Sequence, residues 1–228
     1  MSIKMIRAVI FDMDGVLIDS EPVYAGWLEA FLKKHHVEVP DSELRRVAGI
    51  SSQDFKKKLQ SWWAASGKPY MSGEDIDKMF EKYCDGFSLS FKKIMDSHAE
   101  EVMAWLKEAG CKVAVASSSP MDDIKKVLAD TGLCKYVDVK VSGEMFANSK
   151  PDPQIYLYTV NQLGLEAGEC IAVEDSAYGI QAASGAGVKV IAKRDDRFGF
   201  DQSLADYRVD HLGQVMEMIS KENGDAMK

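Results

Sequence analysis

The sequence lacks the paired cysteines that hold structural zinc. Its four cysteines are widely separated, no Cys-x-x-Cys pair occurs, and no histidine stands beside them to complete a metal site. We therefore expect reduced, mostly structural thiols in a cytoplasmic protein. The cysteines are Cys84, Cys111, Cys134 and Cys170.

Long apolar runs and an excess of positive charge are also missing. No run approaches the roughly 18 apolar residues that a membrane span needs. Asp12 interrupts the N-terminal segment before the apolar core of a signal peptide could form. The chain carries 28 Lys and Arg against 36 Asp and Glu, a net charge of −8. This balance argues against a nucleic-acid partner, and an anionic substrate would need a local positive site. We expect a monomer without membrane contact.

One short stretch, from Arg7 to Glu21, combines an apolar run with two aspartates. Ala8 to Phe11 is typical of a strand buried on both faces. Asp12 and Asp14 follow at its C-terminal end, where open α/β sheets bind their ligands. Two carboxylates this close repel each other, so they favour a cation, and their oxygens suit Mg²⁺. Taken alone, the pair fits a solvated strand end equally well.

The order of the predicted elements indicates the fold class. Helical spacing of apolar residues dominates from residue 21 to residue 95, with no strand. From residue 100, helices alternate with strands expected at 111–116, 137–141, 171–174 and 189–192, before a polar, irregular stretch at 194–207 and a last helix. Such alternation predicts a parallel sheet. We therefore predict an α/β protein with a Rossmann-like parallel sheet core flanked by helices (residues 1–17 and 96–228) and an inserted all-helical cap domain (residues 18–95).

Three further polar clusters fall at predicted strand ends. Ser117, Ser118 and Ser119 precede a helix, where they suit either an anion site or a simple helix cap. Lys150 stands in a loop before two prolines, a place where a single lysine is usually solvated. Glu174-Asp175 forms a second acidic pair after a buried strand.

Together these clusters indicate phosphoryl transfer. Parallel strands bring their C-terminal ends to one edge, so one crevice would hold both acidic pairs, the serines and the lysine. Carboxylates for Mg²⁺, a hydroxyl and a lysine for phosphoryl oxygens, and a spare carboxylate as nucleophile are the groups that this chemistry uses.

The motifs resemble those of a known family. Asp12-Met-Asp-Gly-Val-Leu, Ala116-Ser-Ser-Ser, Ser149-Lys-Pro and Val173-Glu-Asp-Ser are similar to the four ordered motifs of the haloacid dehalogenase superfamily. The chain resembles most its β-phosphoglucomutase-like phosphatases, which carry a helical cap after the first motif, over about Arg7 to His211. Many of them have Pro-Gly where Ser97-His98 stands here.

The resemblance implies roles for the residues of the core. Asp12 would attack phosphorus and form an acyl phosphate, while Asp14 would act as general acid and then general base. The Mg²⁺ ion would be held by Asp12, the backbone carbonyl of Asp14 and Asp175, with Glu174 either a ligand or a neighbour that holds one. Ser117 and Lys150 would bind the transferring group, with Ser118 and Ser119 beside the substrate.

The resemblance also bears on the cap and on the alternatives. Ser51, Ser52 and Gln53 match the cap loop that touches the leaving group in relatives, although the same residues suit an ordinary turn and helix cap. A phosphohexomutase would have histidine at Tyr24 and arginine at Ser52, and a true dehalogenase would lack the second aspartate of the first motif. A receiver-like signalling module would lack the helical insertion, which suits a lid that excludes water. We therefore expect a Mg²⁺-dependent phosphatase acting on a small phosphorylated metabolite, such as a sugar phosphate.

Overall fold

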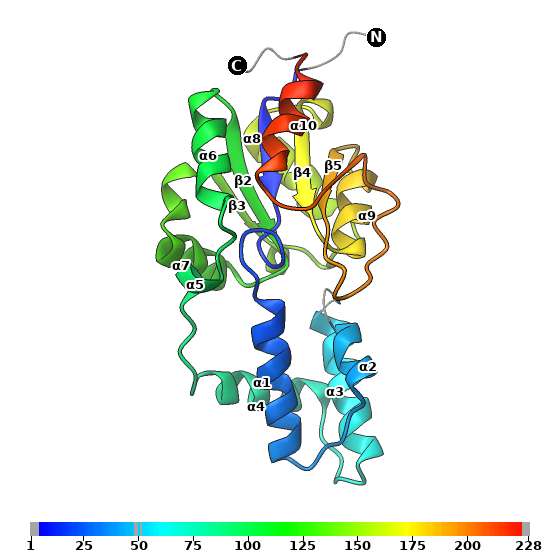
Figure 1. Cartoon of the computed structure of the whole chain (residues 1–228). Helices are drawn as coiled ribbons and strands as arrows, with labels where there is room; N and C mark the ends of the chain where they lie inside the picture. The colour runs from blue at the N-terminus through cyan, green and yellow to red at the C-terminus, as the bar shows by residue number, and fades with distance from the viewer. Residues whose placement is uncertain (1–4, 48–49, 51, 225–228) are drawn as a thin grey trace. The chain divides into compact units, whose positions relative to one another are not determined.

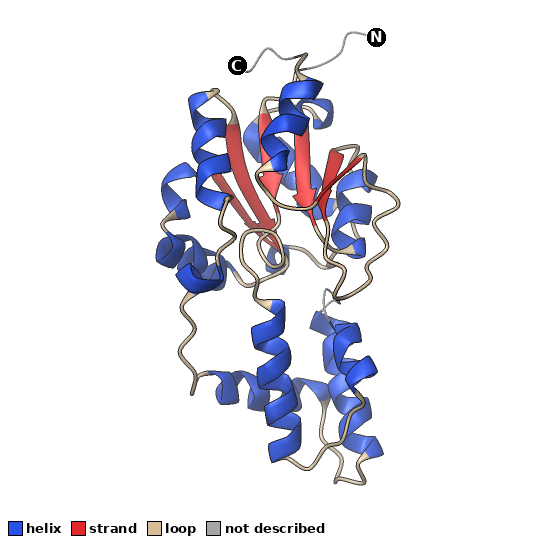
Figure 2. Ribbon diagram, in the orientation of Figure 1, coloured by secondary structure: helices blue, strands red, loops and turns tan. Residues whose placement is uncertain are grey.

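The computed structural model describes residues 5–47, 50 and 52–224, which form two compact units. One unit comprises residues 1–19 and 91–228 and contains the sheet, and the other comprises residues 20–90 and is helical. Figure 1 colours them along the chain, and Figure 2 separates helices from strands. In the part of the chain that is described, no helix is long and apolar enough to cross a bilayer.

The first unit is built on a six-stranded parallel sheet of order β3-β2-β1-β4-β5-β6. Its strands are β1 (Ala8–Phe11), β2 (Lys112–Ser117), β3 (Val139–Ser142), β4 (Cys170–Glu174), β5 (Lys189–Lys193) and β6 (Tyr207–Val209). β1 is central, and Ala8 is in register with Lys112 on one side and Cys170 on the other. All four residues of β1 are fully buried. The expected α/β fold with a parallel sheet is confirmed.

Helices cover both faces of this sheet. One face packs Ala8 and Ile10 against apolar residues of α8 and α9, including Tyr156 and Ile180. α6 and α10 lie in front of the sheet in Figure 1. The helices of this unit are α5 (Phe91–Ile94), α6 (Ala99–Glu108), α7 (Met121–Thr131), α8 (Gln154–Leu163), α9 (Ala177–Gly185) and α10 (Gln214–Glu222), with short 3₁₀ turns at Leu133–Tyr136, Gly143–Met145 and Ala167–Glu169.

The second unit has a core of its own. It contains α1 (Glu21–Lys34), α2 (Asp41–Leu44), a 3₁₀ turn (Arg45–Val47), α3 (Ser52–Ala65) and α4 (Gly73–Cys84). Leu28 and Phe31 of α1 pack with Trp62 and Trp63 of α3 and with Phe80 of α4. The apolar spacing along the sequence thus gives an independent helical core, and the described part of this unit contains no strand.

Two elements differ from the sequence prediction. The polar stretch at 194–207 leads into β6, which pairs with β5 through Ile191 and Tyr207. A three-residue strand is too short to produce a recognisable alternation of apolar and polar residues. The four-residue helix α5 was also not predicted, because one helical turn carries little periodic signal.

Candidate active site

The turn after β1 places the first acidic pair at the C-terminal edge of the sheet. The N–H of Asp12 donates to the carbonyl of Val173 at 2.9 Å, so the turn starts against β4. Gly15 follows with φ +78°. A Cβ there would lie 2.1 Å from Oδ2 of Asp175, so only glycine lets this turn approach the second acidic pair so closely.

Three carboxylates meet at this edge. Oxygens of Asp12, Glu174 and Asp175 all lie within 4.8 Å of one another. Their residues are 8%, 0% and 4% exposed, respectively. Glu174 also packs over α9, since a Cβ on Gly179 would lie 2.0 Å from its Oε2. Buried carboxylates this close require positive charge, and an all-oxygen donor set fits Mg²⁺.

Lys150 supplies part of that charge. Its Nζ donates to Asp12 Oδ1 at 2.8 Å, to Glu174 Oε1 at 2.7 Å and to the carbonyl of Ala116 at 3.1 Å. The residue is only 8% exposed, so Lys150 is not the solvated lysine that its loop, taken alone, would suggest. Burial by itself would lower the pKa of Lys150, but Asp12 and Glu174 hold it above its usual value. Lys150 therefore remains a cation between two carboxylates.

The electrostatics of Asp12 are set mainly by its burial. Burial raises the pKa of Asp12 to about 7, Lys150 opposes the rise and Glu174 adds to it. A carboxyl that ionises near neutral pH in the metal-free protein is poised to exchange its proton for a cation.

The serine cluster is tied to the first acidic pair. The Ser119 hydroxyl donates to Asp14 Oδ2 at 2.8 Å, and its N–H donates to the Ser117 hydroxyl at 3.1 Å. Ser117 is buried, whereas Ser118 is exposed. The N-cap of α7 is Pro120, with no side-chain cap hydrogen bond, so the alternative of a simple serine cap is wrong.

Tyr156 is a residue of the site that the sequence analysis missed. Its hydroxyl, fully buried on α8, donates to Glu174 Oε1 at 2.5 Å, and Lys150 Nζ lies 5.3 Å from the centre of its ring. Burial, together with Glu174, raises the pKa of Tyr156 well above its usual value, so the hydroxyl remains a donor. Its position six residues after Lys150 was the only available signal, and a tyrosine on the apolar face of an amphipathic helix is typical of the core.

The predicted cap residues belong to the helical unit. Ser52 and Gln53 are the first two residues of α3, and both are exposed. Ser51 lies outside the described residues. The predicted contact of this loop with a leaving group stays a prediction.

Comparison with known proteins gives a consistent set of similarities. The family model for haloacid dehalogenase-like hydrolases matches residues 6–187. The chain is 29% identical to the phosphorylated carbohydrates phosphatase of Thermotoga maritima, covering 81% of this chain and 83% of that protein. It is 30% identical to hexitol phosphatase B of Escherichia coli K12, covering 96% and 97%. The crystal structure of β-phosphoglucomutase from Clostridium difficile has the same fold, with a TM-score of 0.77 at 21% identity, covering 97% and 98%.

Proposed function

Because this chain belongs to the haloacid dehalogenase-like hydrolase family, we propose that it is a Mg²⁺-dependent phosphatase that hydrolyses a small phosphorylated carbohydrate through a phosphoaspartate on Asp12. The family resemblance and the assignment to phosphoric monoester hydrolases, both predicted from the sequence, are confirmed. The substrate class is proposed from the names of two relatives, which act on phosphorylated carbohydrates and hexitol phosphates.

The observation that carries the proposal is the buried group of Asp12, Glu174 and Asp175 with Lys150 among them. Asp12, Asp175 and the backbone carbonyl of Asp14 would hold Mg²⁺, with Glu174 beside them. When bound, the ion would offset negative charge on the phosphoryl oxygens. Lys150 and Ser117 supply further polar groups for the same oxygens.

The proposed reaction has two displacements at phosphorus. A carboxylate oxygen of Asp12 forms a bond to phosphorus as the ester P–O bond breaks, and protonated Asp14 gives its proton to the departing alcohol oxygen. Asp14 then takes a proton from water, whose oxygen attacks phosphorus as the Asp12–phosphorus bond breaks. The Ser119 hydroxyl donates to Asp14 Oδ2 at 2.8 Å and so holds this carboxyl beside the serine cluster at the end of β2.

We propose that residues 18–95 act as a cap that restricts the entry of water and contributes to substrate choice. A receiver-like signalling module is the alternative of another class. It would be phosphorylated on an aspartate without turnover, which family membership among hydrolases disfavours.

Asp175→Ala is expected to weaken Mg²⁺ binding by at least about tenfold, because it removes a ligand oxygen. It should affect folding less, since the side chain lies at a strand end. Titration calorimetry on the substrate-free protein measures the affinity. Asp138→Ala is the matched control: its carboxylate accepts from Lys107 and Val113 in the same unit and should leave the affinity unchanged. An unchanged affinity in Asp175→Ala would remove this residue from the ligand set.

Product analysis distinguishes a phosphatase from a mutase. A mutase must hold a second phosphate, yet Tyr24 and Ser52 stand where the resemblance to mutases requires a histidine and an arginine. Losing a charge-assisted hydrogen bond to the second phosphate costs on the order of 1.5 to 3 kcal/mol of binding free energy. Hydrolysis of the acyl phosphate by water should therefore be faster than transfer of the phosphoryl group to a sugar phosphate. The substrate tested is β-glucose 1-phosphate with a trace of glucose 1,6-bisphosphate. If the enzyme accepts this sugar phosphate, we expect free phosphate as the product. Accumulation of glucose 6-phosphate as the main product would establish a mutase instead.

A further inference from the structure

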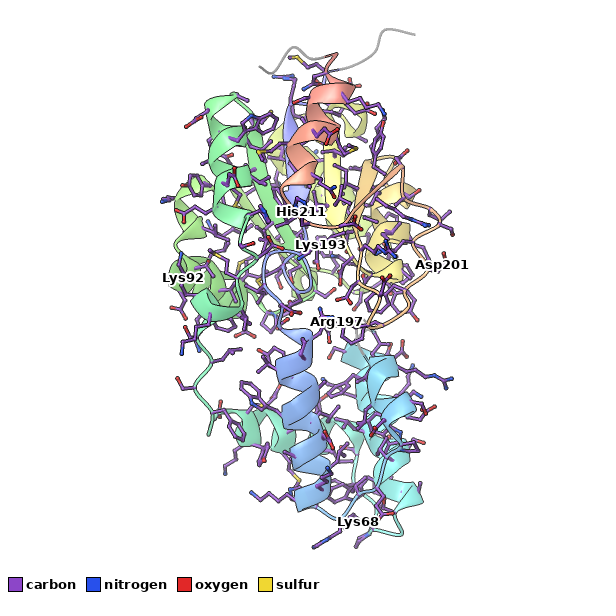
Figure 3. All side chains as sticks on the ribbon, viewed as in Figure 1. Lys68, Lys92, Lys193, Arg197, Asp201 and His211 are labelled. Atoms are coloured by element: carbon purple, nitrogen blue, oxygen red, sulfur yellow. The ribbon has the colours of Figure 1, made fainter. Side chains whose placement is uncertain are left out.

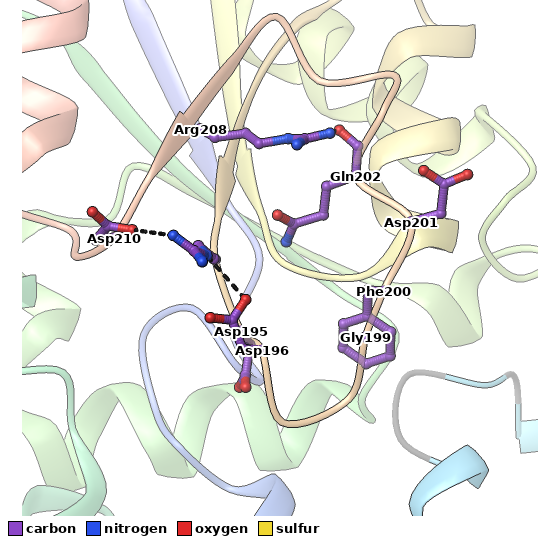
Figure 4. A pocket seen from close by; sticks show the side chains of 9 residues that line it. Asp195, Asp196, Gly199, Phe200, Asp201, Gln202, Arg208 and Asp210 are labelled. Carbon is purple, nitrogen blue, oxygen red and sulfur yellow. Dashed lines mark hydrogen bonds and ion pairs between the residues drawn. The ribbon is translucent and has the colours of Figure 1, made fainter.

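A buried glutamine contacts the backbone of the second acidic pair. Gln202 lies in the segment between β5 and β6 and is 7% exposed. Its side-chain amide nitrogen donates to the carbonyl of Asp175 and to the carbonyl of Lys193, each at 2.8 Å. Figure 4 shows its amide turned in from the segment that carries Asp201. Both amide hydrogens therefore hold main-chain oxygens just beyond β4 and at the end of β5.

Lys193 links the same strand end to the first acidic turn. Its Nζ donates to the carbonyl of Val16 at 3.1 Å and lies 2.8 Å from Asp96 Oδ2. Val16 follows Gly15, whose backbone lies against the Asp175 carboxylate. The two acidic turns thus touch each other. Lys193 at the end of β5 bonds directly to the first turn, and Gln202 connects it to the second.

The segment that carries Gln202 is itself anchored. The Arg197 guanidinium, labelled with Lys193 in Figure 3, donates to both carboxylate oxygens of Asp19, at 3.0 and 2.8 Å, and also to Asp195. The segment that carries Gln202 is therefore anchored five residues before it by Arg197, and the Gln202 amide extends from this anchored backbone to the carbonyl of Asp175.

Repulsion among the buried carboxylates explains why the backbone of Asp175 needs to be held in place. Lys150 pairs with Asp12 and Glu174, and the carboxylates of Asp12, Glu174 and Asp175 have oxygens within 4.8 Å of one another. Like charges this close repel each other, so without a bound metal ion the three carboxylates tend to move apart. A bond to the Asp175 carbonyl opposes rotation of the backbone that carries its carboxylate. The bond to Lys193 keeps the neighbouring strand end in line with it.

We propose that Gln202 is a positioning residue for the Mg²⁺ site, which holds the backbone of Asp175 so that its carboxylate stays in place to bind the ion. This inference rests on the proposed function. A positioning role of Gln202 differs from a purely structural role, because its loss should lower the affinity for Mg²⁺ more than it lowers the stability of the fold.

The test uses Gln202→Met, which keeps the length of the side chain and removes both donors. Titration of the full, substrate-free chain with MgCl₂ should show a dissociation constant about 10- to 100-fold higher than in the wild type. At saturating Mg²⁺ most of kcat should return, and KM should change little. Gln202→Glu, which replaces the donors with acceptors facing the same carbonyls, should show an increase at least as large.

Asn223→Ala is the matched control. The Asn223 side chain also makes two bonds to main-chain atoms, to the N–H and the carbonyl of Ile6, ahead of β1 at the other edge of the sheet. This variant should lower the thermal unfolding midpoint and leave the Mg²⁺ affinity unchanged.

The outcomes separate the inference from the function on which it rests. If the wild type binds Mg²⁺ and Gln202→Met binds it equally well with a lower unfolding midpoint, the residue is only structural and the inference is overturned. If Gln202→Met does not fold, the affinity of Gln202→Glu decides in the same way. If the wild type itself binds no Mg²⁺, the proposed function fails, and the inference fails with it.

Discussion

Asp12→Asn is expected to reduce turnover by more than about 10³-fold while the protein remains folded, because an amide cannot replace the attacking carboxylate. Asp12 directly follows β1 and is not among the apolar residues that form the core of this unit. Release of inorganic phosphate from a panel of phosphate esters, with Mg²⁺ present, measures the loss. A variant that kept a tenth of the wild-type rate would rule out the covalent mechanism.

Asp12→Asn is also expected to change how the stability of the fold depends on pH. Burial raises the pKa of Asp12 to about 7 in the folded, metal-free protein, above its usual 3.8. The folded state then binds this proton more tightly than the unfolded state, so the ionisation of Asp12 disfavours folding. This penalty is full above about pH 7, and it decreases as the pH falls from about 7 to 3.8, the usual pKa of the group. In EDTA above neutral pH, Asp12→Asn should therefore unfold at a temperature no lower than the wild type. Asp138→Asn, which changes an accessible carboxylate, is the control for the loss of turnover and should keep the wild-type rate.

Lys150→Met is expected to lower kcat/KM by about 10²- to 10³-fold, since it removes a fixed positive charge from the site of phosphoryl transfer. It should also change how Mg²⁺ binding depends on pH. Lys150 lowers the pKa of Asp12, so its loss should raise that pKa above about 7. Protons then compete with Mg²⁺ up to a higher pH, and the midpoint of ion binding moves in the alkaline direction.

Mg²⁺ titrations across the neutral range, with wild type and variant in parallel, measure that midpoint. Lys107→Met serves as the control, because Lys107 pairs with Asp138 at 2.7 Å in a more exposed setting and should change neither rate nor midpoint. An unaltered rate and pH profile in Lys150→Met would mean that this lysine serves only the fold.

The parts of the site at strand ends were predictable from the sequence. Asp12, Asp14 and Glu174-Asp175 follow short apolar runs, and the geometry of a parallel sheet requires such ends to share one edge. Lys150 was placed there only together with the other clusters, because nothing local distinguishes it from a solvated lysine. Its burial depends on the tertiary structure, in which its Nζ bonds to the carbonyl of Ala116 in β2.

Tyr156 and Gln202 could not be found in the same way. Tyr156 stands in an amphipathic helix, where a large ring indicates core packing, and its role lies in one hydroxyl. Gln202 stands in a polar, irregular stretch, and nothing in the sequence indicates that its side chain is buried. Their contacts join segments distant in the sequence, and no local pattern encodes such pairs.

The central position of β1 has a consequence for how the chain folds. β1 lies between β2 and β4, with Ala8 opposite Lys112 and Cys170, and the whole helical unit intervenes before β2. Such distant pairings slow folding, because chain entropy is lost before the contacts form. The helical unit can form its own core from segments that are closer along the chain than β1 is to β2 or β4, such as Phe31 with Phe80. Its early collapse would shorten the loop that β1 must close, so the order of folding is expected to run from the inserted helices to the sheet.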